Sequence, residues 1–210
     1  MDKTYGQYCG LARSLDRVGD RWTLLIVREL LVAPARYGEL QDGLPGIATN
    51  LLAQRLRKLE ADGIVRRRVA GDAGAAVVYE LTPTGEDLAD VVLALVRWGA
   101  TWMQDGPGDD AFRPRWLVIA LRAVLPRVPA SQAARLTVRC RDQSVNVVRD
   151  DEGLRVSLGE AIQPHATLTA EPEAILALAT EVLTLDDLER AGSARLDGTR
   201  TALRRCFFGR

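Results

Sequence analysis

The spacing of apolar residues changes once within the first hundred residues, and this change limits the possible folds more than any other feature. Between positions 5 and 62 apolar residues recur every three or four positions, which is typical of amphipathic helices. From Ile64 to Leu81 the period becomes two, around the turn-forming residues 71–74, which predicts a β-hairpin. The predicted elements are helices over 5–18, 20–32, 37–41 and 49–62, strands over 64–70 and 76–81, and a helix from Thr82 to about residue 104.

The second half of the chain has a different pattern. Residues 105–112 are rich in Asp, Gly and Pro and predict a linker between a domain over 1–104 and another over 113–210. In the second domain Leu136, Val138 and Cys140 alternate with polar residues, so a sheet with one dry face is expected. We predict an α+β fold, in which this domain has an antiparallel-type sheet with helices on one face. Its predicted elements are helices over 114–125, 172–183, 185–191 and from 199, and strands over 135–141, 144–149, 154–158, 166–170 and 195–197.

Composition excludes several classes of protein. Hydrophobic residues make up 47% of the chain, so a globular fold is expected, and the formal net charge is zero. We find no long apolar span and no apolar signal segment near the start, which predicts a cytoplasmic protein with no membrane partner. Three separated cysteines and one histidine make no metal pattern. The sequence shows no nucleophile motif or phosphate loop, and we expect neither an enzyme nor a cofactor.

The helix predicted over 49–62 has the polarity of a DNA-reading helix. Leu52, Leu56 and Leu59 fall on one face, whereas amide and cationic side chains fall on the other. Positions 44–58 contain no acidic residue, and three arginines follow at 66–68, on the first strand of the hairpin. Such side chains suit base edges and phosphates, although many ordinary surface helices also carry them.

Residues 9–104 resemble the HxlR family of winged-helix transcriptional regulators, relatives of the MarR group. The resemblance rests on the runs VGDRWTLLIVREL (18–30), YGEL (37–40), LPGI (44–47), LLAQRLRKLEADGIV (51–65) and YELTPTG (79–85). It implies a homodimer built from the first and last helices of this half, which binds a near-palindromic operator on double-stranded DNA and acts as a repressor. The implied DNA-binding residues are Arg36, Thr49, Asn50, Gln54, Arg55, Arg57, Lys58, Arg66, Arg67 and Arg68.

Two departures from the family pattern affect the expected affinity. Ala48 and Ala53 stand where the family often has Ser or Thr, so two polar contacts are missing. We expect moderate affinity that falls steeply with salt. Trp22 is expected in the core rather than at DNA.

Cys9 matches the position of a cysteine that some family members use to sense oxidants or electrophiles. A thiol senses when its thiolate is accessible and stabilised by positive charge, which Arg13 is expected to supply. The alternative is a small, half-buried residue at a dimer seam. Cys140 is expected to be structural, and Cys206 is uninformative.

Residues 113–210 resemble a sterol-carrier-protein-like domain. The resemblance rests on ATLTAEPEAILAL (166–178), LDDL (185–188) and GSARLDG (192–198). It implies a cavity for an apolar small molecule that modulates DNA binding; the alternatives are a brace for the dimer, or a lipid-binding module whose winged-helix half has lost DNA binding. His165 is expected in a loop. The candidate pocket residues, for each of which core packing is the competing interpretation, are Trp116, Leu117, Leu121, Leu183, Phe207 and Phe208.

Overall fold

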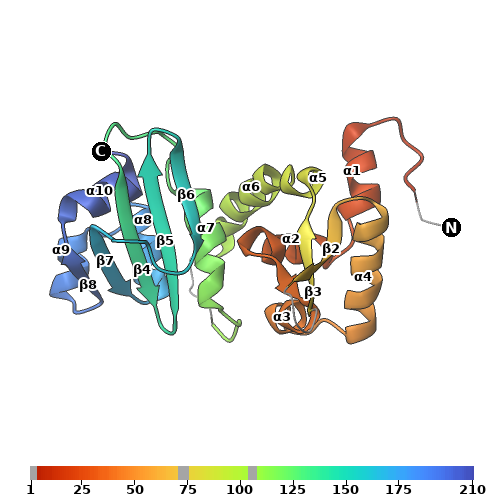
Figure 1. Cartoon of the computed structure of the whole chain (residues 1–210), viewed down its shortest axis with the longest axis horizontal. Coiled ribbons are helices and arrows are strands. Elements are labelled where there is room, and N and C mark those ends of the chain that lie inside the picture. The colour runs from red at the N-terminus through yellow and green to blue at the C-terminus, as the bar shows by residue number, and fades with distance from the viewer. Residues whose placement is uncertain (1–3, 71–75, 104–107) are drawn as a thin grey trace. The chain divides into compact units, whose positions relative to one another are not determined.

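A computed structural model describes residues 4–70, 76–103 and 108–210 of the chain (Figure 1). The chain forms two compact units, residues 1–92 and 93–210, and the boundary between them falls within helix α6 (Ala89–Gly99). The elements form an α+β fold with two separate sheets.

The N-terminal unit begins with four helices. They are α1 (Gly10–Val18), α2 (Thr23–Val32), α3 (Tyr37–Gly43) and α4 (Thr49–Ala61). The predicted start of the first helix at residue 5 is wrong, because Gly6 adopts a positive φ and the Tyr5 N–H donates to the Asp16 carboxylate. The second helix starts at Thr23 rather than residue 20, since Asp20 belongs to a turn that accepts from the Thr23 N–H.

A three-stranded antiparallel sheet follows, in the order β1-β3-β2. Strands β2 (Val65–Ala70) and β3 (Ala76–Leu81) form the predicted hairpin, whose expected tip at 71–74 lies outside the described residues. Strand β1 (Ala35–Arg36) pairs with β3 and was not predicted, because two residues carry no periodicity.

The single helix predicted over 82–104 is wrong. The chain forms α5 (Pro83–Glu86), α6 (Ala89–Gly99) and the 3-10 turn η1 (Ala100–Trp102). The Thr82 hydroxyl caps α5 by accepting from the Gly85 N–H. A Cβ on Gly85 would lie 2.2 Å from the Ile64 carbonyl oxygen, so α5 packs closely on the start of the hairpin before the chain turns into α6.

The C-terminal unit contains a five-stranded sheet in the order β6-β5-β4-β7-β8. Its strands are β4 (Ala134–Cys140), β5 (Gln143–Asp150), β6 (Gly153–Leu158), β7 (Ala166–Ala170) and β8 (Ala194–Gly198). The antiparallel-type prediction is wrong for one pair, because β4 and β7 are parallel. After β6 the chain returns to the free edge of β4, where the His165 N–H donates to the Arg135 carbonyl, and β7 therefore enters in the same direction as β4.

The helices of this unit are η2 (Pro114–Trp116), α7 (Leu117–Val124), α8 (Pro172–Ala179), α9 (Leu185–Arg190) and α10 (Arg200–Phe208). Helix α10 contacts β4, β5 and β7, and α7 contacts β6 and α8. Helix α8 ends four residues before the predicted end, since Glu181 adopts a positive φ and the N–H groups of Val182 and Leu183 donate to the Ala177 carbonyl.

Arg149 lies in the core of this unit, with 0% of its surface exposed. Its guanidinium donates to the Cys206 carbonyl at 3.0 and 3.3 Å and to the Val128 carbonyl at 2.5 Å. Burial lowers the pKa of Arg149. A buried cation held by carbonyl dipoles thus joins β5 to the end of α10 and to the segment before β4.

Candidate nucleic-acid interface

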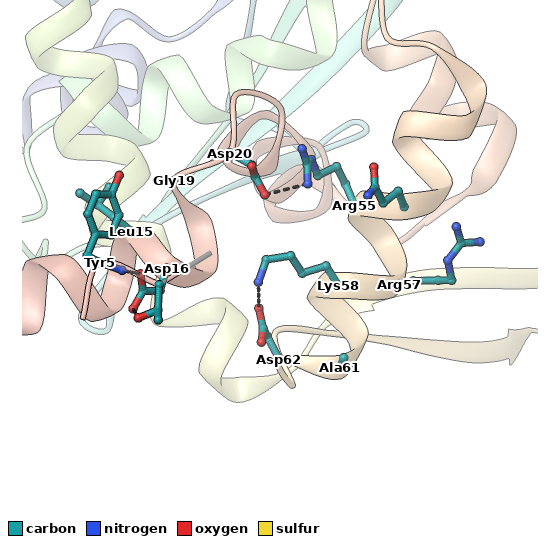
Figure 2. A pocket seen from close by; sticks show the side chains of 12 residues that line it. Tyr5, Leu15, Asp16, Gly19, Asp20, Arg55, Arg57, Lys58, Ala61 and Asp62 are labelled. Atoms are coloured by element: carbon teal, nitrogen blue, oxygen red, sulfur yellow. Dashed lines mark hydrogen bonds and ion pairs between the residues drawn. The ribbon is translucent and has the colours of Figure 1, made fainter. Parts of the chain in front are cut away.

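Helix α4 presents one buried and one exposed face, as predicted. Leu52, Leu56 and Leu59 are almost completely buried, whereas Asn50, Gln54 and Arg57 are exposed. Arg57 makes no ion pair with any residue that the structure describes. In the close view its side chain points away from the N-terminal segment (Figure 2). This face therefore offers amides and one unneutralised cation, which are suitable groups for base edges and phosphates.

The first turn of α4 is held by α3. The Tyr37 hydroxyl donates to the Thr49 carbonyl, and the Gln41 side-chain amide donates to the Thr49 hydroxyl, both at 2.7 Å. These bonds fix the direction in which α4 leaves the turn after α3. The Thr49 hydroxyl is therefore already engaged within the protein.

Arg55 and Lys58 lie on the flank of α4 that faces α1. The Arg55 guanidinium contacts the Asp20 carboxylate at 2.7 Å, and the Lys58 ammonium contacts the Asp62 carboxylate at 3.1 Å (Figure 2). Arg17 also contacts Asp62, at 3.0 Å. A groove of about 940 Å³ runs along this flank. It is lined by Thr4, Tyr5, Leu15, Asp16, Gly19, Asp20, Gln54, Arg55, Arg57, Lys58, Ala61 and Asp62.

The three arginines of β2 are also paired with carboxylates. Arg66 and Arg68 both contact Glu80 on the neighbouring strand, and Arg67 contacts Glu60 of α4, each at 2.9 Å. The hydrogen bonds from Arg68 and Arg66 lower the pKa of Glu80, although its burial acts in the opposite direction. Glu80 is therefore ionised at neutral pH and available to both arginines.

Sequence reasoning identified the cations of this surface and missed the carboxylates that hold them. The four-residue spacing of Lys58 and Asp62 was a readable signal. Glu80 could have been placed opposite Arg66 once the hairpin register was known. Asp20 carries no such signal, because its contact with Arg55 depends on how α1 packs beside α4.

Arg36 is exposed, and its backbone N–H donates to the Glu39 carboxylate at 2.5 Å.

Cys9 is the exposed N-cap residue of α1. The nearby backbone N–H groups of Ala12 and then Leu11 lower the pKa of its thiol, which makes no side-chain cap hydrogen bond with a described residue. The predicted role of Arg13 as the stabilising charge is not what the structure shows, since Arg13 approaches Asp16, at 3.9 Å. The positive end of the helix supplies the stabilisation instead.

Exposed apolar side chains occur on and before α1 in the N-terminal unit, and on α6 and η1 around the boundary of the two units. Trp98 and Trp102 are 66% and 68% exposed and meet edge to face, with ring centroids 4.6 Å apart. Single exposed apolar residues are ordinary, whereas adjoining ones such as these two rings are typical of surfaces that contact other proteins. The other exposed apolar residues in these regions are Tyr5, Tyr8, Leu11, Leu15, Val91, Leu95 and Met103.

The six candidate pocket residues do not form one pocket. Leu117, Leu121 and Phe207 are completely buried core residues, and Trp116 is half-buried against Phe112. The other two line a hollow of about 510 Å³ between α8, α9 and α10. The lining residues are Leu178, Glu181, Leu183, Thr184, Leu185, Asp186, Arg200, Leu203, Arg204, Phe208 and Arg210.

Within residues 4–70, 76–103 and 108–210, no group of three or more His, Cys, Asp or Glu side chains is arranged to hold a metal ion. No helix there is both long and apolar enough to cross a membrane.

Helices α3 and α4, followed by the β2–β3 hairpin, define a winged helix-turn-helix protein. The model of the HxlR-like helix-turn-helix family matches residues 17–107. An uncharacterised HTH-type transcriptional regulator of Synechocystis sp. is 35% identical over 99 residues, which are 47% of this chain and 73% of that protein. The HTH-type transcriptional regulator YodB of Bacillus subtilis is 35% identical over 92 residues, which are 44% and 80% of the two chains.

Among solved structures, the redox regulator HypR in its oxidised form is 33% identical, with a TM-score of 0.42, over 44% of this chain and 96% of that one. The identity to the curated relatives, over most of their length, shows that the chain belongs to the HxlR-like helix-turn-helix family through its first hundred residues. Membership of this family of transcriptional regulators implies DNA binding.

Proposed function

We propose that the protein is a homodimeric transcriptional repressor that binds a near-palindromic operator through α4. The observation that carries this proposal is the exposed face of α4, where Asn50, Gln54 and Arg57 lie together and no described residue supplies a carboxylate partner for the arginine. Thr49 would contact DNA through its backbone N–H at the start of the helix, because its hydroxyl already accepts a hydrogen bond from Gln41. Arg36 and the hairpin arginines 66–68 would hold the DNA backbone.

The homodimer is proposed from the exposed apolar residues of α1, α6 and η1. A second copy of this chain would cover Leu11, Trp98 and Trp102, in the manner implied by the family resemblance. Two-fold symmetry of such a dimer would place two copies of α4 on one face of a DNA duplex, and the operator would then be near-palindromic.

We assign the effector to the second half of the chain, and we propose a domain over 1–104, a linker over 105–112 and a second domain over 113–210. The sterol-carrier resemblance suggests an apolar small molecule, and the hollow that contains Leu183 and Phe208 is lined in part by apolar side chains. Its lining also includes charged side chains: Arg200 pairs with Asp186 and with Glu189 outside the lining, and Arg210 pairs with Glu181. The ligand must therefore tolerate a partly polar lining. It would alter DNA affinity only if it binds two dimer geometries unequally.

The exposed thiol of Cys9 favours a second candidate, a regulator that senses oxidants or electrophiles. Its lowered pKa increases the fraction of reactive thiolate at neutral pH. Oxidant-induced release of DNA that persists in a Cys9→Ser variant would contradict this candidate.

The first test is fluorescence anisotropy with DNA from upstream of the protein's own gene, beside a scrambled duplex of the same length. Arg57→Ala should weaken operator binding about tenfold and reduce the slope of log affinity against log salt by about one. Arg139→Ala, which removes an exposed arginine from the C-terminal unit, is the matched control and should bind as the wild type. If the wild type shows no preference for the upstream DNA, fragments selected from the whole genome replace it. No preference in that selection would contradict the proposal and favour a lipid-binding module.

A further inference from the structure

The groove beside α4 has an acidic wall, formed by Asp16, Asp20 and Asp62 (Figure 2). The three carboxylates have different partners. Asp16 accepts from the Tyr5 N–H and the Thr4 hydroxyl, at 2.9 and 3.0 Å, and so binds the N-terminal segment. Asp20 and Asp62 instead hold the two cations on this flank of α4. Of the three acids of this groove, Asp20 and Asp62 are therefore the two that are placed to compete with DNA.

In the ion pair between Asp20 and Arg55, the carboxylate is more exposed to solvent than the guanidinium, so the carboxylate is the partner that another anion can replace. The Arg55 side chain is 20% exposed, and its Nε is buried without a hydrogen-bond partner among the described residues, whereas the Asp20 side chain is 38% exposed. Within the part of the chain that the structure describes, the Arg55 guanidinium thus pairs with one carboxylate, which lines the groove. A phosphate oxygen that enters the groove can take the place of the carboxylate, because the two anions accept the same hydrogen bonds.

Asp62 is held more firmly than Asp20. Its two oxygens contact Arg17 and Lys58, and its side chain is 17% exposed. Loss of its charge would release two cations at once, and one of them belongs to α1. Asp20 is consequently the cleaner position at which to measure competition.

We infer that Asp20, with Asp62 in a supporting role, acts as a built-in substitute for DNA phosphate and limits the affinity of α4 for DNA of any sequence. The inference rests on the proposed function and deepens it. Because Arg55 already has an anion, binding of a phosphate exchanges one partner for another and gains little. Arg57 has no such partner among the residues that the structure describes, so discrimination between sequences is left to the exposed face of α4.

The experiment is anisotropy with the operator and the scrambled duplex over a salt series, using full-length Asp20→Asn. We expect scrambled-DNA affinity to rise about threefold to tenfold at low salt, with a salt slope steeper by about one. Operator affinity should rise by the same factor or less, so the preference for operator should not increase. Asp20→Glu keeps the charge and should behave as the wild type.

Two controls remove the effect of net charge. Asp16→Asn removes an acid of the same groove that has other partners, and Asp151→Asn removes one from the C-terminal unit; each should change affinity less than twofold. A double-mutant cycle with Arg55→Gln isolates the mechanism, because Asp20→Asn should have no effect once Arg55 is absent. Chemical denaturation of each variant establishes that it is folded.

The outcomes separate this inference from the proposed function. Wild-type protein that binds neither duplex contradicts both. Wild-type binding together with an Asp20→Asn variant of unchanged affinity contradicts the inference alone. Weaker binding by this variant also contradicts it and assigns Asp20 the opposite role of orienting Arg55 for DNA. The inference is also overturned if Asp20→Asn increases the affinity for scrambled DNA as much in the Arg55→Gln variant as in the wild type.

Discussion

One arginine and two cysteines of the C-terminal unit lie in an environment opposite to that of the arginines and the cysteine at the surface of the N-terminal unit. In the N-terminal unit the arginines of β2 and Arg55 lie at the surface beside carboxylates, and Cys9 is exposed at the start of a helix. In the C-terminal unit Arg149 lies in the core among carbonyl oxygens, and Cys140 and Cys206 are buried. The comparison teaches that a surface pair can exchange its partner for a ligand, whereas a buried cation has no alternative partner and serves stability.

The cysteines provide the largest expected difference between the units. Burial raises the pKa of Cys140 to about 11 and that of Cys206 to about 12, whereas the pKa of Cys9 is lowered. Because only the thiolate reacts, we expect iodoacetamide to modify Cys9 at pH 8 at least about a thousandfold faster than Cys206 in the folded protein. Mass spectrometry of peptides over time measures the rates.

The reaction at Cys9 should accelerate with pH and level off below the pH at which an ordinary thiol does so, since its folded-state pKa is depressed. Denatured protein provides the control, in which the three cysteines should react at similar rates. Equal rates in the folded protein would remove the contrast between the exposed and buried thiols.

Substitution of the buried arginine should have the next largest effect. Arg149→Ala leaves the Cys206 and Val128 carbonyls without their donor and opens a cavity, and we expect a loss of about 3 kcal/mol in the free energy of unfolding. Urea denaturation measures it. Arg155→Ala is the matched control on strand β6, where an exposed arginine pairs with Asp150 and Glu152 and should contribute less than about 1 kcal/mol. Similar losses in the two variants would contradict the assignment of Arg149 to the stability of the core.

The smallest effect is expected at the hairpin. Glu80→Gln releases Arg66 and Arg68 and should strengthen binding to scrambled DNA about twofold to fivefold at low salt. Glu60→Gln releases Arg67 alone and should give a smaller gain. Anisotropy measures both variants, and weaker binding by Glu80→Gln would indicate that the carboxylate orients these arginines for DNA rather than occupying them.

The sequence predicted the features that depend on local periodicity. The buried leucines of α4, the β2–β3 hairpin and the strands β4 to β8 all follow from spacing along the chain. It did not predict strand β1, the break between α5 and α6, or the parallel pairing of β4 with β7, since each depends on contacts between distant segments.

In the candidate DNA surface too, the features set by local spacing were predicted and the contacts between distant segments were not. Residue type and helix period identified Asn50, Gln54 and Arg57 as members of one face, which the structure leaves exposed. They could not show that Arg55 faces Asp20, because that contact joins residues 35 positions apart in the chain and depends on tertiary packing. Charge counted along a sequence therefore overstated the cations available to DNA, and the expected steep dependence on salt now rests on fewer of them.

The parallel pair at the centre of the larger sheet has a consequence for how the chain folds. Strands β6, β5 and β4 are joined by short turns and pair with their sequence neighbours, so they can assemble early with little loss of chain entropy. Strand β7 must close a longer loop before it meets β4, and β8 adds only after β7 is in place. Until then, β4 presents an unpaired edge, and this interval is when a nascent chain is most exposed to association with another copy.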